Sequence, residues 1–213
     1  MTGRLSPLQT DILDAFFRRE RRFFLTGGAA LAGFYLRHRE TADLDLFTTH
    51  DVLADGEAAL RAVAGEIGGT IENVQTATDF RRRLVRRRDD SVVVDLVFDH
   101  APQGVDSKRE FGSVRVDPPG EILANKLCTL LSRAEPRDLV DVMFLDRAGF
   151  KVEQWIALAA QKDAGLTAGQ LAWVLSQITI GADAQVPGGV TPAELQLFLA
   201  DLQRRLATMA FPA

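Results

Sequence analysis

The chain has 213 residues, of which 46% are hydrophobic and 25% are charged, a composition typical of a globular protein and not of a disordered or fibrous one. Its formal net charge of −4 at pH 7 argues against a protein that coats nucleic acid through its overall field. Cys128 is the only cysteine, which excludes an intramolecular disulfide and a cysteine-based zinc site.

The first residues lack the apolar core of a signal peptide, and the longest nearly apolar run, Leu25 to Leu36, is too short to span a bilayer. We therefore expect a cytoplasmic protein with no membrane partner. The three histidines do not have the spacing of paired metal ligands, so we expect no histidine metal site.

The N-terminal third predicts a helix, a strand, a turn, a helix and a strand. Ser6, Pro7 and Gln9 have the pattern of a capping box with proline at the first helical position, so a helix should run to about Arg19. The following elements are a buried strand at 23–25, the pair Gly27-Gly28, a helix at 29–38 and a strand at 43–47.

A helix at 51–67, ended by two glycines, is followed by short β-branched or alternating segments, and these predict strands at 70–76, 80–87, 92–98 and 113–116. After Pro118-Pro119-Gly120 every periodic segment is helical: 121–133, 137–147, 152–162, 167–180 and 191–208. Trp155 and Trp173 lie at helical spacings and are expected in the core. The pattern predicts an α+β protein, with a mixed β-sheet and helices in residues 1–117 and a helical C-terminal part in residues 118–213.

The glycine pair and two aspartates indicate a site for a metal-bound nucleotide. Gly27 and Gly28 let the backbone approach a ligand closely, and the N–H groups of the helix that follows favour phosphate. Asp43 and Asp45 are two apart on a strand and point to one face, where oxygen ligands suit Mg²⁺. The alternative is a simple tight turn and a solvated strand face, but the order of the elements favours phosphoryl-type chemistry.

Asp95 lies in an otherwise apolar strand, SVVVDLVFD, and a buried unpaired carboxylate is costly. Its partner is either an arginine in a structural pair or a metal shared with Asp43 and Asp45. We favour the second alternative, with Asp95 as a third ligand or general base.

The helix at 121–133 places Lys126 and Arg133 seven residues apart on one side, and Asp138 and Asp141 follow at i and i+3 on the next helix. Arg137 lies four residues before Asp141, within pairing range. A surface salt-bridge network is the alternative to a role for Lys126 in neutralising a triphosphate, and the metal site proposed upstream favours the triphosphate role.

Six arginines lie within eight residues between Arg81 and Arg88. This arginine run is equally consistent with contact to a polyanion, such as a nucleic acid backbone, and with protection of an exposed strand edge.

These segments together resemble the AbiEii/AbiGii toxin family of nucleotidyltransferases, a branch of the DNA polymerase beta-like superfamily, in order over residues 20–147. The family's glycine turn falls on Gly27 and Gly28 and its metal-binding carboxylates on Asp43 and Asp45. Its Lys…Arg-Asp-x-x-Asp element falls on Lys126, Arg137, Asp138 and Asp141. The superfamily usually has serine after the first glycine, and Gly28 here lacks that phosphate-binding hydroxyl.

The resemblance implies a nucleotidyltransferase-type sheet, a cognate DNA-binding antitoxin as partner, and transfer of a nucleotide to RNA, tRNA 3′ ends in some members. It implies Mg²⁺ as cofactor and a nucleoside triphosphate as substrate. The expected metal ligands are Asp43, Asp45 and Asp95. The expected catalytic residues are these three with Lys126 and Asp138, and the expected nucleotide-binding residues are Gly27, Gly28, Lys126, Arg133 and Asp141.

Two alternatives stay open. The acceptor could be a protein side chain or a small hydroxyl compound, and the arginine run would discriminate, because an acceptor RNA needs it on the catalytic face. The chain could also be a catalytically silent nucleotide-binding module. The base of the nucleotide, the acceptor and the oligomeric state do not follow from the residues.

Overall fold

The computed structural model describes residues 4–105, 107–133 and 135–211, which divide into two compact units. The described residues of Met1–His100 and Asp106–Pro118 form the first, here called the sheet unit. Those of Ala101–Val105 and Pro119–Ala213 form the second, the helical unit. The functional division into a catalytic part and a part that completes the nucleotide site stays a prediction.

Seven strands form one mixed sheet in the described part of the sheet unit, in the order β3-β4-β5-β2-β1-β7-β6. β2 pairs in parallel with β5, and β1 in parallel with β7, whereas the other neighbours are antiparallel. The strands are β1 (Phe23–Thr26), β2 (Asp43–Thr48), β3 (Thr70–Ala77), β4 (Phe80–Arg87), β5 (Asp90–Phe98), β6 (Arg109–Phe111) and β7 (Val114–Val116). The prediction of a mixed sheet with helices is confirmed, although the short strand β6 was not expected.

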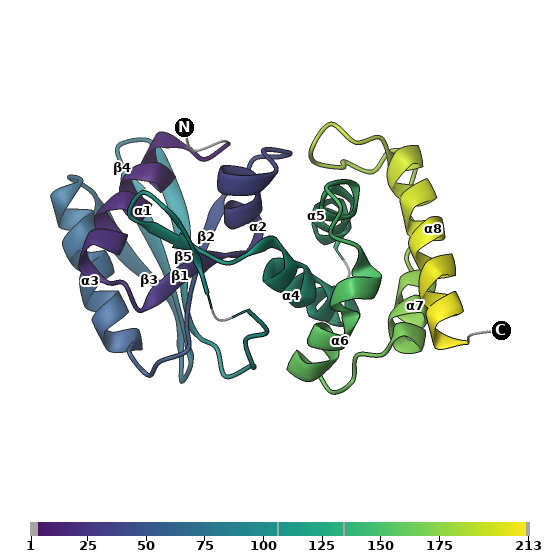
Figure 1. Cartoon of the computed structure of the whole chain (residues 1–213). Helices are drawn as coiled ribbons and strands as arrows, with labels where there is room; N and C mark the ends of the chain where they lie inside the picture. Colours follow the sequence, from purple (N-terminus) through teal and green to yellow (C-terminus); the bar gives the residue numbers. More distant parts are fainter. Residues whose placement is uncertain (1–3, 106, 134, 212–213) are drawn as a thin grey trace. The chain divides into compact units, whose positions relative to one another are not determined.

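Helices cover both faces of this sheet (Figure 1). Helices α1 (Pro7–Arg19) and α3 (Leu53–Glu66) pack on one face, and α2 (Gly27–Ala30) lies against β1 and β2 on the other. α2 continues into one π-helical stretch, η1 (Leu31–Tyr35), so the helix predicted at 29–38 ends earlier than expected. The predicted capping box at the start of α1 is confirmed.

Alternation along β2 decides which side chains reach the core. Leu44 and Leu46 are fully buried on the side of α1 and α3, whereas Asp43 and Asp45 are partly exposed on the side of α2. This separation follows from the two-residue period of a strand. It places the carboxylates and the glycine turn on the same face.

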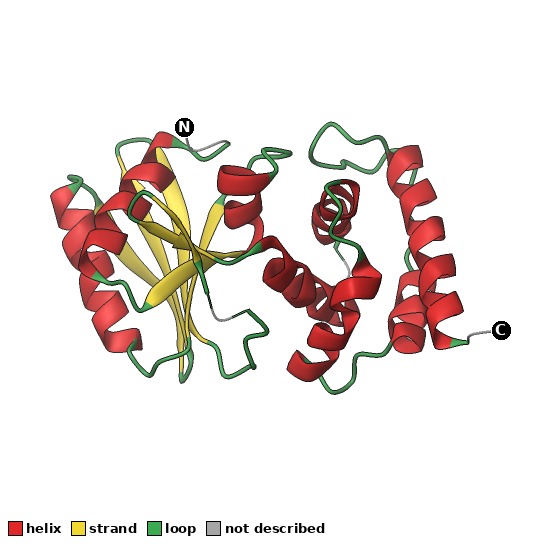
Figure 2. Ribbon diagram, viewed as in Figure 1, coloured by secondary structure: helices red, strands yellow, loops and turns green. Residues whose placement is uncertain are grey.

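The helical unit contains α4 (Pro119–Ser132), α5 (Pro136–Arg147), α6 (Val152–Lys162), α7 (Ala168–Ser176) and α8 (Pro192–Ala210). In Figure 2 the strands are confined to the sheet unit, as the sequence predicted. The expectation that Trp173 is a core residue is wrong, because 59% of it is exposed on α7. No helix among the described residues is long and apolar enough to cross a lipid bilayer.

A buried carboxylate explains why residues 101–105 belong to the helical unit. Glu121 in α4 is fully buried, and its Oε2 accepts hydrogen bonds from the backbone N–H groups of Gly104 at 3.1 Å and Val105 at 3.0 Å. Its Oε1 lies 2.5 Å from Nζ of Lys162, which is also buried. This pair therefore holds a loop, α4 and α6 together.

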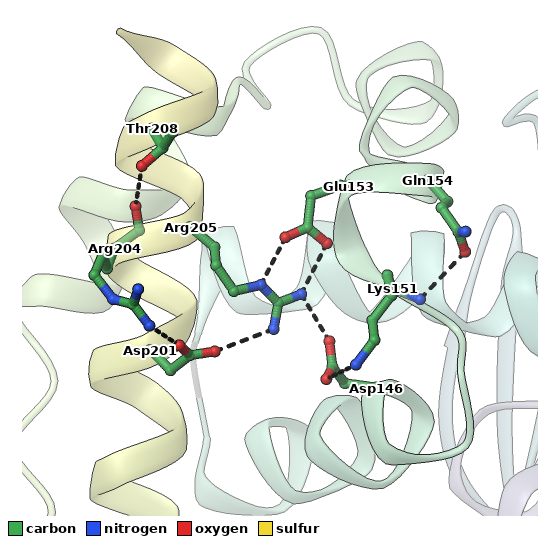
Figure 3. A network of polar contacts seen from close by, with 8 residues as sticks. All are labelled: Asp146, Lys151, Glu153, Gln154, Asp201, Arg204, Arg205 and Thr208. Atoms are coloured by element: carbon green, nitrogen blue, oxygen red, sulfur yellow. Dashed lines mark hydrogen bonds and ion pairs between the residues drawn. The ribbon is translucent and has the colours of Figure 1, made fainter. Parts of the chain in front are cut away.

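An ion-pair network joins α8 to α5 and α6 (Figure 3). Arg205 of α8 donates to Glu153 at 2.6 and 2.8 Å and to Asp146 at 2.7 Å. Lys151 donates to the same Asp146 at 2.6 Å, and Asp201 accepts from Arg205 one helical turn earlier. Each charge has a partner of opposite sign, so the network stabilises helix packing.

Candidate functional site

Three of the predicted carboxylates lie on one face of the sheet unit. Strand register places Thr26 opposite Asp45, Asp45 opposite Asp95, and Asp95 opposite Arg82, so these four residues form one row across β1, β2, β5 and β4. Residues in register point to the same face of a sheet. Asp43 lies on that face as well, two residues before Asp45.

The glycine turn lies close to the side chain of Asp45. Gly27 has a φ of 65°, which side chains rarely adopt, and a Cβ atom placed there would lie 2.2 Å from Oδ2 of Asp45. Glycine is therefore required at this position for both its conformation and its close approach. The hydroxyl of Thr26, next to the turn, is buried with no hydrogen-bond partner among the described residues.

A second contact orients Asp43. The Thr41 hydroxyl donates to Oδ1 of Asp43 at 2.8 Å, and the Gln9 side-chain amide donates to the Thr41 carbonyl at 2.9 Å. α1 thus helps to position the loop that leads into β2. The sequence reasoning missed Thr41, although a hydroxyl two residues before a carboxylate is a common local hydrogen-bonding arrangement.

Arg82 is the partner of Asp95. Its Nε and Nη2 donate to the two carboxylate oxygens at 2.8 and 2.7 Å, so the structure contains the arginine pair that the sequence left open as an alternative. The hydrogen bonds that Arg82 donates to Asp95 raise the pKa of Arg82 despite partial desolvation, and the charges of Asp95, Asp43 and Asp45 raise it further. The positive charge of Arg82 therefore interacts with all three carboxylates, those of Asp43, Asp45 and Asp95.

The donor set fits a magnesium ion in part. The described residues contain no group of three or more His, Cys, Asp or Glu side chains arranged to hold a metal. Asp43 and Asp45 suffice for Mg²⁺, which one or two carboxylates usually hold together with substrate phosphates. Arg82 uses one lone pair of each Asp95 oxygen, and a second lone pair remains on each.

Lys126 of the helical unit lies between two carboxylates. Its Nζ is 2.8 Å from Asp138 and 2.7 Å from Asp141, both fully buried, and Arg133 approaches Asp138 at 3.3 Å. Burial lowers the pKa of Lys126, but the charges of Asp141 and Asp138 outweigh it and the pKa is raised overall. The alternative of a surface salt-bridge network does not hold for Lys126, Asp138 and Asp141, because these three are buried, whereas the side chain of Arg133 is 50% exposed.

Arg137 does not join that cluster. It pairs with Glu135 at 2.7 Å and not with Asp141, the partner that its spacing suggested. The structure thus brings together Lys126, Arg133, Asp138 and Asp141 within the helical unit, and Gly27, Gly28, Asp43, Asp45 and Asp95 within the sheet unit.

The arginine run divides between the two faces of β4. The alternative that the run protects an exposed strand edge does not hold, because β4 lies between β3 and β5. Glu57 on α3 and Asp11 on α1 pair with three of the arginines in β4. Arg82 and Arg86 alternate with these three and point to the face of the carboxylates. The arginines on the side of α1 and α3 are Arg81, Arg83 and Arg87.

Similar solved structures share the fold. A candidate nucleotidyltransferase from H. pylori is 18% identical, with a TM-score of 0.62 over 95% of this chain and 92% of that chain. JHP933 from Helicobacter pylori is 19% identical, with a TM-score of 0.59 over 95% and 92%. MenT4, a nucleotidyltransferase toxin from Mycobacterium tuberculosis H37Rv, is 16% identical, with a TM-score of 0.58 over 97% and 83%.

No curated protein matches the chain. The family described as nucleotidyl transferase AbiEii toxin, type IV toxin–antitoxin system, matches residues 11–210. This match includes the glycine turn, the carboxylate row and the Lys126 cluster. The chain therefore belongs to the nucleotidyl transferase AbiEii toxin family of type IV toxin–antitoxin systems and is a nucleotidyltransferase.

Proposed function

We propose that the chain transfers a nucleoside monophosphate from a nucleoside triphosphate to an RNA acceptor, such as a tRNA 3′ end, in a Mg²⁺-dependent reaction. A cognate antitoxin protein is the proposed partner. The observation that carries the proposal is that the Asp45 carboxylate occupies the space that a side chain at Gly27 would need, with Asp43 on the same strand face. A phosphate that follows the glycine turn therefore reaches the carboxylates.

Asp43 and Asp45 are the proposed magnesium ligands. When bound, the ion neutralises phosphate charge and makes the phosphorus atom more electrophilic. Thr41 holds Asp43 through its hydroxyl at 2.8 Å, and this contact fixes the direction of one ligand before substrate arrives. Gly27 and Gly28 contribute backbone contacts that a side chain would obstruct.

Asp95 is the proposed general base or third ligand. In transfer, the acceptor hydroxyl oxygen forms a bond to the α-phosphorus, the bond to the bridging oxygen breaks, and pyrophosphate leaves. The proton of the hydroxyl passes to a base. Arg82 orients Asp95 through two hydrogen bonds, while one lone pair on each carboxylate oxygen stays available.

The buried cluster of the helical unit is the proposed second part of the nucleotide site. Lys126, with Arg133 and the carboxylates Asp138 and Asp141, corresponds to the family element noted in the sequence. Lys126 stays protonated, since its two acidic neighbours raise its pKa. Its proposed role is to balance triphosphate charge, and this role requires that the two carboxylates share the lysine with the ligand.

A protein or small-molecule acceptor is the second candidate. The division of the arginine run favours it, because three of the six arginines pair with carboxylates of α1 and α3, on the face opposite Asp43 and Asp45. The RNA acceptor is proposed from the family resemblance and not from this strip.

The test is transfer of label from each of four α-labelled nucleoside triphosphates, with Mg²⁺ and total cellular RNA, by wild type and Asp45→Asn. The amide replaces the carboxylate with little change in shape, so the variant should stay folded. We expect label in RNA with wild type and a loss of at least about 100-fold with the variant, a typical cost of removing a group that stabilises transition-state charge.

Label that appears in protein instead would identify the second candidate. Equal transfer by both proteins at matched purity would contradict the role of Asp45. The absence of label in every fraction would favour a silent nucleotide-binding module.

A further inference from the structure

Arg39 lies beside the glycine turn, in the loop between η1 and β2. It is 8% exposed, and a Cβ atom on Gly28 would lie 2.4 Å from its Nη2 atom and 3.3 Å from its Cζ atom. Its Nη1 donates to the backbone carbonyl of Glu40 at 3.0 Å. The guanidinium group thus occupies the space that a side chain at position 28 would need.

This contact explains the glycine at position 28. Gly28 is not among the residues with a positive φ, so its backbone conformation is open to other residues. It is also the second residue of the four-residue helix α2, where helix propensity does not favour glycine. The structural reason for glycine here is therefore the space that it leaves for Arg39.

The position of Arg39 suits phosphate. Gly27 touches the Asp45 carboxylate while its neighbour Gly28 touches Arg39, so one turn presents a carboxylate and a guanidinium side by side. A metal-bound phosphate chain carries negative charge beyond what one divalent ion neutralises. The planar guanidinium fork matches phosphate oxygens geometrically.

We propose that Arg39 binds the phosphate chain of the nucleoside triphosphate at the Gly27-Gly28 turn. This inference rests on the proposed function. Arg39 is a binding residue in it, and Gly28 is a positioning residue that acts through Arg39.

The test is a double-mutant cycle on nucleotide affinity. Binding of each nucleoside triphosphate with Mg²⁺ is measured by calorimetry for wild type, Arg39→Ala, Gly28→Ala and the double variant, with thermal melting as a folding control. Arg61→Ala is the matched arginine control, because Arg61 lies exposed on α3 and pairs with Glu57.

We expect Arg39→Ala to weaken triphosphate binding roughly tenfold or more, as loss of charge-assisted hydrogen bonds does. Nucleoside monophosphate binding should weaken less, a selectivity change that a purely structural role would not cause. Gly28→Ala should stay folded and still weaken binding, because the methyl group displaces the guanidinium. The double variant should bind no more weakly than Arg39→Ala.

Wild-type triphosphate affinity in a folded Arg39→Ala protein would overturn the inference while leaving the proposed function intact. A double variant with additive losses would also overturn it, because Gly28→Ala would then obstruct the ligand directly. If Arg39→Ala does not fold, triphosphate affinity is measured for Gly28→Ala and Arg39→Lys instead. Wild-type affinity in both variants would refute the binding role of Arg39. Wild type that binds no triphosphate and transfers no label would instead refute the proposed function.

Discussion

At the scale of single residues, the structure gives Lys126 a structural role in addition to the expected nucleotide-binding role. Lys126 was expected to neutralise a triphosphate, and it is also the counter-ion of two fully buried carboxylates. Removing one partner from a buried ion pair leaves an uncompensated charge in a medium that solvates it poorly. Any test of nucleotide binding at this residue must therefore measure folding as well.

We predict that Lys126→Ala lowers the free energy of unfolding by about 3–5 kcal/mol, since Asp138 and Asp141 lose their common partner. It should also weaken triphosphate binding in whatever fraction stays folded. Urea unfolding and calorimetry measure the two effects.

Lys151→Ala is the control for that variant. Lys151 also pairs with an aspartate, Asp146, but its side chain is 48% exposed, so the expected cost is at most about 1 kcal/mol. An unchanged nucleotide dissociation constant in Lys126→Ala would refute the nucleotide role and leave a structural one.

At the scale of elements, close packing between α4 and α6 depends on a glycine. A Cβ atom on Gly120 would lie 2.1 Å from the indole atoms Cη2 and Cζ2 of Trp155. Trp155 is partly exposed, yet it fills the space above the first turn of α4. Gly120, in the Pro-Pro-Gly segment that marks the boundary in the sequence, therefore also leaves the space into which Trp155 packs.

We predict that Gly120→Ala destabilises the protein by about 1–3 kcal/mol, because the indole must shift in a packed interface. Gly65→Ala in α3 is the matched control. Apart from its chain neighbours and the backbone of α3, no atom of the described residues lies within 4 Å of the new methyl group, and helix propensity favours alanine by up to about 1 kcal/mol. In thermal unfolding, Gly120→Ala should lower the melting temperature and Gly65→Ala should raise it. Similar melting temperatures would contradict the packing argument.

At the scale of the whole molecule, ion pairs in both units make stability depend on pH. The hydrogen bond from Arg205 lowers the pKa of Glu153 below its usual 4.5, with desolvation opposing it, and Arg22 does the same for Glu20. A carboxylate with a lowered folded-state pKa contributes stability that is present above the unfolded pKa and lost as pH falls through the folded value.

We predict that the free energy of unfolding falls as the pH drops from about 6 to about 3, and that Glu153→Gln reduces the slope. At neutral pH the variant should be less stable than wild type, and the two should converge in acid. Urea unfolding across this range measures the effect, and parallel curves would contradict a contribution from the Glu153–Arg205 pair.

Local sequence patterns predicted most elements of both units. The capping box of α1, the alternation of β2 and the helical periodicity after Pro118 all depend on residues a few positions apart, and the structure contains each element. The short strand β6 was not predicted, because three residues are too few to show an alternation of apolar and polar side chains. Trp173 was misplaced because helical spacing does not say which helix face meets a neighbour.

By itself, the sequence determined the α+β architecture, the glycine turn, and the common face of Asp43 and Asp45, because each follows from short-range geometry. Only the tertiary structure decided that Arg82 holds Asp95, that two buried carboxylates hold Lys126, and that Arg39 occupies the space above Gly28. These contacts depend on strand register, helix packing and loop path. The charges of the partners are visible in the sequence, but the distances that pair them arise only when the chain folds.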